Sequence, residues 1–246
     1  MEQANEVLRQ LTERKSVREF EDQEIAPEDR ERILRAALQA PTAGNQMLYT
    51  IIEGTDPHIR LALSESCDHQ PFIARAKMVL VFCADPLKWH DAYLGAGLPA
   101  RPLGAGDLLL AAQDAAIAAQ NAVTAAWSLG IGSCYIGDIL ENRERQKEIL
   151  NLPDGVVPFS MAVFGYPTAQ QRERKKPQRA ELRYIVHENA YRRMEMPELT
   201  EMLRYHFGED PDGARLRAFC ERKFNSGFSR EMTRSVREYL KEFEGQ

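Results

Sequence analysis

The chain has 246 residues, 43% of them hydrophobic, which is enough for one large domain or two small ones with a buried core. Its formal charge of −5 argues against a general nucleic-acid binder, because non-specific binding depends on neutralising phosphates. The N-terminal stretch MEQANEVLRQLTERK carries charges throughout and lacks the apolar region of a secretory signal. No stretch reaches the apolar length of a membrane span.

The cysteines are far apart in the sequence and form no metal-ligand spacing with histidine. They are Cys67, Cys83, Cys134 and Cys220. We therefore expect reduced thiols, no bound metal and a cytoplasmic location.

Residues 3–13 place Val7, Leu8 and Leu11 at helical spacing, which predicts a first helix.

The segment RKSVREF follows at residues 14–20. If this segment is extended, its side chains alternate between two sides. One side then holds Arg14, Ser16, Arg18 and Phe20, and the other holds Lys15, Val17 and Glu19. Two guanidinium groups and a hydroxyl on one side suit a phosphate, and a solvated basic turn is the alternative.

A second helix is expected to start at Pro27 and to stop before Pro41. Its expected buried stripe consists of Ile33, Leu34, Ala37 and Leu38. The next residues, PTAGNQ at 41–46, predict a loop in which glycine and asparagine adopt positive φ.

The remaining pattern alternates strands and helices without a repeating βα period, which favours an α+β layered domain. Strands are expected at residues 49–53, 78–83, 133–136, 156–164 and 184–187. An alanine-rich helix is expected at 106–130, with Gly106 before it and Gly130 at the C′ position. This helix is either a dimer element or an ordinary buried helix. Residues 195–246 read as amphipathic helices whose expected buried positions are Leu199, Met202, Leu203, Leu216, Phe219, Val236, Leu240 and Phe243.

The segment GIGSCYIG at 130–137 lacks the third glycine of a dinucleotide fingerprint and follows a helix, so we interpret it as a helix end leading into a short strand. Gly137 at the strand end permits close approach of a flat ligand.

The basic run RERKKPQR at 172–179 is either a solvated loop or, less favoured, an RNA contact within 172–183. No motif for nucleophilic catalysis is present, so no residue is named as acid, base or nucleophile.

Taken in order, RKSVREF, PTAGNQ, HQPFIARAKMVLVFCAD, AAQNAVTAAWSLGIGSCYIGDI, KKPQR and IVHENAY resemble the FMN-dependent nitroreductase superfamily. The similarity is strongest to its NADPH-preferring nitroreductase and flavin reductase branch, and it covers residues 6–195.

The resemblance implies an FMN site. The matching positions are Arg14, Lys15, Ser16, Arg18, Thr42, Asn45, Gln70, Tyr135, Ile136, Gly137, Asp138, Lys176 and Arg179. It implies that Arg14 and Ser16 bind the phosphate and that Arg18 lies near the N1 edge of the flavin. This sequence has KPQR where the branch usually has Lys-Pro-Arg, so either Lys175 or Lys176 is the phosphate ligand.

The resemblance also implies the architecture and the activity. The expected fold is a three-layer α+β sandwich with a mainly antiparallel sheet, in an entwined homodimer. The expected domains are an FMN-binding domain over 1–194 and a helical extension over 195–246. The expected function is ping-pong hydride transfer from NADPH or NADH through FMN to a small nitroaromatic, quinone or flavin acceptor, without nucleic-acid or membrane partners. The alternatives are reductive dehalogenation, flavin fragmentation, or a non-catalytic flavin-binding module.

Overall fold

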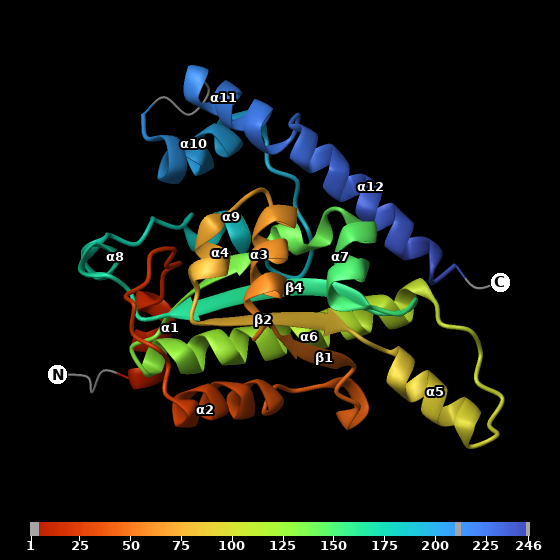
Figure 1. The fold of residues 1–246 in the computed structure, drawn as a ribbon. Helices are drawn as coiled ribbons and strands as arrows, with labels where there is room; N and C mark the ends of the chain where they lie inside the picture. The colour runs from red at the N-terminus through yellow and green to blue at the C-terminus, as the bar shows by residue number, and fades with distance from the viewer. Residues whose placement is uncertain (1–4, 210–212, 245–246) are drawn as a thin grey trace. The chain divides into compact units, whose positions relative to one another are not determined.

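One antiparallel sheet of four strands, in the order β1-β2-β4-β3, organises the fold (Figure 1). The computed structural model describes residues 5–209 and 213–244. The strands are β1 Tyr49–Glu53, β2 Met78–Ala84, β3 Gly132–Ile136 and β4 Val157–Gly165. Four of the strands expected from the sequence are therefore confirmed, and the α+β class is confirmed with them.

The chain divides into two units, one formed by residues 1–174 and 231–246 and the other by residues 175–230. The helices of the first unit are α1 Glu6–Glu13, α2 Pro27–Leu38, η1 Ala43–Asn45, α3 Pro57–Ser66, α4 Pro71–Arg75, α5 Leu87–Gly95, α6 Ala105–Ser128, η2 Gly137–Leu140, α7 Arg143–Leu150 and α8 Ala169–Glu173. The second unit contains α9 Leu182–Ile185, α10 Met196–Phe207 and α11 Ala214–Lys223. Helix α12, Gly227–Lys241, crosses the boundary at residue 231. A domain boundary at residue 194 stays a prediction.

Strand β2 is buried on both faces, because helices cover both sides of the sheet (Figure 1). Alternation sends Met78, Leu80 and Phe82 into the core under α2 and α6. It sends Val79, Val81 and Cys83 into the core under α3 and α4. The uninterrupted apolar run of β2 is the sequence signature of this three-layer arrangement.

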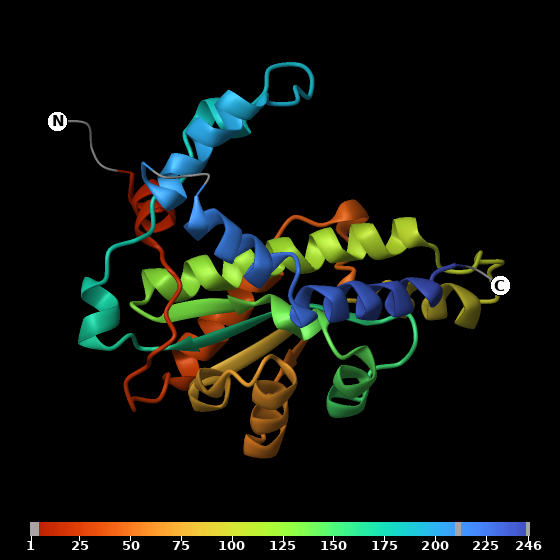
Figure 2. The same ribbon diagram turned by 90° about the horizontal axis from the view of Figure 1, so that it is seen from above.

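A third, smaller core lies where the C-terminal end of α12 packs on the first unit. Tyr239 and Phe243 are buried there against Leu108, Ala111 and Val157. Figure 2 shows this part of α12 beside α6. Of the buried positions expected in residues 195–246, Phe243 is buried, and the other seven are half-buried.

The ends of the long helices follow from short-range chemistry. Helix α2 ends before Pro41 as expected, and Gly130 follows α6 with φ +76°. The expectation for Gly106 is wrong: α6 begins at Ala105, since the Asp107 carboxylate accepts a hydrogen bond from Gly104 N at 2.8 Å and caps the helix earlier.

The strand expected at 184–187 is wrong. Residues 182–185 form the short helix α9, in which Val186 N donates to Leu182 O at 2.8 Å. Ile185 and Val186 are more than half exposed, so their β-branched side chains have no sheet face to cover.

One side chain of the expected buried stripe is exposed in the single chain: Leu38 is 48% exposed. The apolar side chains Val7, Leu8 and Leu11 of α1 are exposed as well. Helical spacing therefore predicted the helices correctly, but it did not predict which surface covers their apolar faces.

Candidate functional site

Residues 14–20 lie along strands β3 and β4 because two glycines leave room for them. Ser16 pairs with Ser133 as a parallel bridge, and Val17 N donates to Ser133 O at 2.8 Å. A Cβ atom at Gly132 would lie 2.6 Å from Val17 Cγ2, and one at Gly165 would lie 2.7 Å from the Phe20 ring. Gly132 and Gly165 are register partners, so Val17 and Phe20 pack on the same face of the sheet. The strict alternation expected for residues 14–20 is therefore wrong.

Replacing Gly132 by Ala is expected to lower the free energy of unfolding by about 1–3 kcal/mol, because Val17 must move to admit the methyl group. Urea denaturation followed by circular dichroism measures the change. Gly137→Ala is the matched control, since a Cβ atom there meets nothing within 4 Å. Equal stability losses in the two variants would contradict the close-packing explanation.

Basic side chains at this segment play two different parts. Lys15 and Arg174 make hydrogen bonds to backbone carbonyl groups, whereas one nitrogen of Arg14 has no partner among the described residues. Lys15 Nζ donates to Arg172 O at 2.6 Å and also to Arg174 O. Arg174 Nη2 donates to Ser16 O at 2.5 Å, so residues 172–174 are tied to this segment. Within the described residues, Arg14 Nη1 is buried without a hydrogen-bond partner. A buried guanidinium nitrogen without an acceptor fits an anionic ligand such as a phosphate.

The end of β3 adjoins Arg14. Burial raises the pKa of Tyr135 to about 12, and the nearby Arg14 charge opposes that increase. The Tyr135 hydroxyl donates to Gln120 Oε1 at 3.4 Å. Ile136 is buried, whereas Gly137 is exposed and presents open backbone where η2 begins. A flat ligand could therefore approach the chain at Gly137.

The C-terminal end of α3 completes this region. Burial raises the pKa of the Cys67 thiol to about 12, and Asp138 contributes to the increase, which places the two side chains near each other. Gln70 Nε2 donates to Cys67 O at 2.9 Å, and Gln70 is half-buried. Arg18 is exposed and lines a cavity of about 330 Å³ with Arg75. The structure thus places residues 16–17 beside Ser133, and Cys67 in one core with Cys134 and Ile136.

Thr42 and Asn45 lie at the opposite end of the sheet. The loop 41–46 leads into Tyr49, which pairs with Ala84, whereas Gly132 pairs with Gly165 at the other end (Figures 1 and 2).

Gly44 and Asn45 have φ of 58° and 57°, as expected for this loop. The Thr42 hydroxyl donates to Asp114, and the same carboxylate accepts from Leu48 N at 3.1 Å. Lys176 and Arg179 belong to the second unit, and their part in the site stays a prediction.

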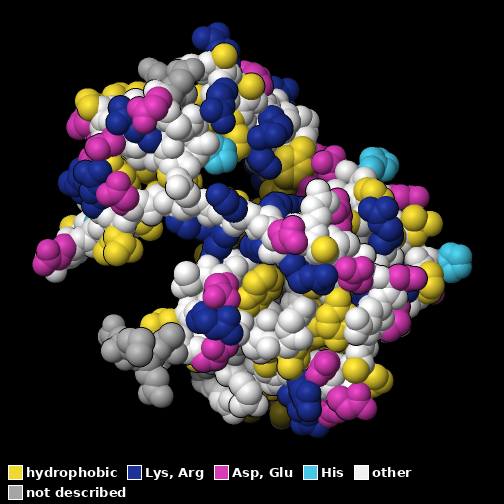
Figure 3. All heavy atoms as spheres, turned by 90° about the vertical axis from the view of Figure 1, so that its left-hand side faces the viewer, with side chains coloured by type: hydrophobic (Ala, Val, Ile, Leu, Met, Phe, Trp, Pro, Cys, Tyr) yellow, Lys and Arg dark blue, Asp and Glu magenta, His cyan; other side chains and the backbone are white. Residues whose placement is uncertain are grey.

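Sequence reasoning missed Asp114 and Arg174, which hold two of the expected site segments in place. Asp114 is 4% exposed in an alanine-rich helix, and a lone acidic residue among alanines was the available signal. Arg174 lies in the basic run that was noticed, but its bond to Ser16 depends on tertiary contact. Figure 3 shows Lys and Arg side chains interspersed with Asp and Glu, so positive charge is local and not spread over this face.

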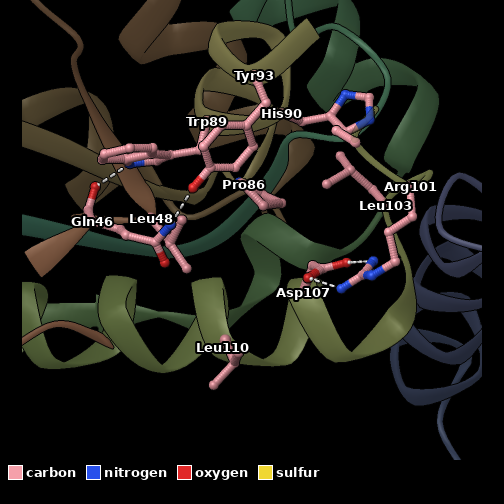
Figure 4. A pocket seen from close by; sticks show the side chains of 11 residues that line it. Gln46, Leu48, Pro86, Trp89, His90, Tyr93, Arg101, Leu103, Asp107 and Leu110 are labelled. Carbon is pink, nitrogen blue, oxygen red and sulfur yellow. Dashed lines mark hydrogen bonds and ion pairs between the residues drawn. The ribbon is translucent and has the colours of Figure 1, made fainter. Parts of the chain in front are cut away.

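A separate cavity of about 260 Å³ lies beside the loop 41–46 (Figure 4). Trp89 and Tyr93 form an aromatic wall, and Trp89 Nε1 donates to Gln46 O at 2.6 Å. Arg101 and Asp107 also line the cavity and form an ion pair of 2.6 Å (Figure 4).

In the part of the chain that the structure describes, no group of three or more His, Cys, Asp or Glu side chains could hold a metal ion. No helix there is both long and apolar enough to cross a membrane. All four cysteines are free, and burial raises the pKa of the Cys83 thiol to about 12.

Comparisons with a family model, with known protein sequences and with solved structures agree with one another. The model of the nitroreductase family matches residues 11–166. The chain is 30% identical over 242 residues to an FMN reductase [NAD(P)H] of Bacillus subtilis, covering 96% of this chain and 91% of that protein. It is 37% identical over 182 residues to an oxygen-insensitive NADPH nitroreductase of Salmonella typhimurium, covering 72% and 71%. The solved structure of the NfrA1 nitroreductase from B. subtilis superposes with a TM-score of 0.78 at 26% identity, covering 96% and 97%.

Proposed function

The chain belongs to the nitroreductase family, and on that premise we propose that it is an NAD(P)H-dependent FMN oxidoreductase that reduces nitroaromatic, quinone or flavin acceptors. The observation that carries the FMN assignment is the buried Arg14 Nη1, which has no partner within residues 5–209 and 213–244. It lies next to Tyr135 and in the segment that Ser16 anchors to β3. A phosphate is the anion that would satisfy this nitrogen and the neighbouring hydroxyl together.

When bound, FMN accepts a hydride from NADPH or NADH and passes it to the acceptor. Arg14 and Ser16 would hold its phosphate, and Lys176 and Arg179 are the further cations that the sequence resemblance assigns to it. Tyr135, Ile136, Gly137 and Asp138 would line the ring, and Gln70 would donate a hydrogen bond to it. Donor and acceptor use the same site in turn, which is a ping-pong order, and the cytoplasmic location stays a prediction.

The positions of Thr42 and Asn45 support a homodimer. Both lie at the far end of the sheet from Arg14, so one chain does not assemble the full set of residues. The single chain also exposes apolar side chains on α1 and α6. These are Val7, Leu8, Leu11, Leu109, Leu110 and Ile117. A second copy covers such surfaces and brings its own loop 41–46 to the site.

The colour of the purified protein tests the function. We expect a flavin absorption spectrum that is bleached by NADPH or NADH under anaerobic conditions and restored by a quinone. A protein that is colourless and does not take up added FMN would contradict the proposal. A bound flavin that neither nucleotide reduces would identify a non-catalytic flavin-binding module instead.

Arg18 has a separate expected effect on the flavin. Arg18→Ala is expected to lower FMN affinity and to lower the midpoint potential of the bound flavin by about 30 mV, which equals ~1.4 kcal/mol for two electrons. The physical reason is that a fixed cation stabilises the negative charge of the reduced flavin. Spectroelectrochemical titration measures the potential, and an unchanged value would remove this role from Arg18.

A further inference from the structure

Glu141 is a buried carboxylic acid immediately after the η2 turn. The residue is 5% exposed, and its backbone N donates to Asp138 O at 3.0 Å. Over the described part of the chain, its Oε1 is buried without a hydrogen-bond partner. A buried ionised carboxylate without compensation is costly, so the side chain is more stable when it carries a proton.

The groups that face Glu141 strengthen this preference. Burial is the main cause that raises its pKa to about 8, and the carboxylates of Asp138, Asp68 and Glu231 raise it further. They come from η2, from the end of α3 and from α12. Cys67, also at the end of α3, is neutral because its own pKa is raised to about 12. Glu141 is therefore surrounded by negative and neutral groups.

Two cations close in sequence to this cluster, Arg234 and Arg143, are engaged elsewhere. Arg234 donates to Glu231 Oε1 at 2.8 Å and to Glu144 Oε2 at 2.7 Å. Arg143, two residues after Glu141, pairs with Glu242. These contacts dock α12 on α7 and leave both guanidinium groups bound to other carboxylates. An ionised Glu141 would gain little compensation from them.

We infer that Glu141 is a positioning residue that holds the η2 segment in its FMN-binding arrangement only while its carboxyl group is protonated. The inference rests on the proposed function, since FMN is the ligand whose binding it affects. Ionisation of the buried Glu141 adds a fourth negative charge to those of Asp138, Asp68 and Glu231, and repulsion then separates η2 from α3 and α12. Gly137 and Asp138 belong to η2, so the FMN site loosens.

The protonation also couples to folding. The folded-state pKa of about 8 lies above the ordinary value of 4.5 for a glutamic acid. The stabilising effect of the bound proton is therefore complete below pH 4.5 and is lost as the pH rises through about 8. Unfolding in urea is expected to become easier over this interval in the wild type, and Glu141→Gln is expected to remove that part of the pH dependence.

The decisive experiment measures the FMN dissociation constant by quenching of flavin fluorescence between about pH 7 and about pH 9, above the second phosphate pKa of ~6. We expect wild-type binding to weaken about tenfold over this range, and Glu141→Gln to bind like the wild type at the lower pH with no loss at the higher. The matched control is Glu148→Gln on α7, where Glu148 is exposed and pairs with Arg145 at 2.7 Å. This variant is expected to keep the wild-type pH dependence.

Infrared spectroscopy reads the proton directly. A carboxylic C=O band is expected in the wild type at the lower pH and is expected to be absent at the higher pH and in Glu141→Gln. Absence of the band in the wild type, or the same pH dependence of FMN binding in Glu141→Gln, overturns the inference. If no FMN is bound at any pH, the proposed function itself fails and the positioning role falls with it.

Discussion

Replacing Arg14 by Met is expected to weaken FMN binding about 100-fold, or ~2.7 kcal/mol. Hydrogen bonds to a charged group contribute roughly 1.5–3 kcal/mol each, and the buried Nη1 of Arg14 is available to make one. Met keeps an apolar side chain of similar length and removes the charge. Because the nitrogen has no partner among the residues described, its removal is expected to leave the free energy of unfolding unchanged or higher.

This combination distinguishes a ligand-binding residue from a structural one. Flavin fluorescence quenching gives the dissociation constant, and urea denaturation of the FMN-free protein gives the stability. Arg35→Met on α2 is the control, because Arg35 is exposed and pairs with Glu31 at 2.6 Å. Unchanged FMN affinity in Arg14→Met, or an equal loss in both variants, would contradict the phosphate-binding role.

Glu242→Gln is expected to destabilise the protein by about 3–5 kcal/mol. The Glu242 side chain is 6% exposed and accepts hydrogen bonds from Arg143, from Lys147 at 2.8 Å and from Gly155 N at 2.8 Å. A neutral amide removes the buried counter-charge of Arg143 and Lys147, whose shared remaining partner, Asp154, is largely exposed to water. Urea denaturation followed by circular dichroism measures the loss, and α12 is expected to detach first.

The matched control for that change lies on the same helix. Glu238 pairs with Lys241 at 2.6 Å, but its side chain is 33% exposed and the pair is in contact with water. Glu238→Gln is therefore expected to change stability by less than about 1 kcal/mol. Similar losses in the two variants would show that the docking of α12 does not depend on the burial of Glu242.

The local elements of this protein were predictable because their causes are local. The apolar run at 78–83 forms β2, the alanine-rich stretch forms α6, and Pro41 and Gly130 follow the ends of their helices. The exception is residues 184–187, where β-branched side chains predicted a strand. No strand among the described residues pairs with them, and backbone hydrogen bonds within the segment favour a helical turn.

The sequence by itself determined the layered α+β class, the order of the motifs and the family they indicate. It also located the basic segment and the glycine-ended strand that form one region of the site. Only the tertiary structure decided that Val17 packs into the space left by Gly132. It also decided that Lys15 and Arg174 donate to backbone carbonyl groups. Among the described residues, it left the buried Nη1 of Arg14 without a hydrogen-bond partner. It also decided that the charges of Asp68 and Glu231 act on the buried Glu141. The physical reason is that periodicity and turn chemistry act over a few residues, whereas burial and charge interactions depend on which distant segments the folded chain brings together.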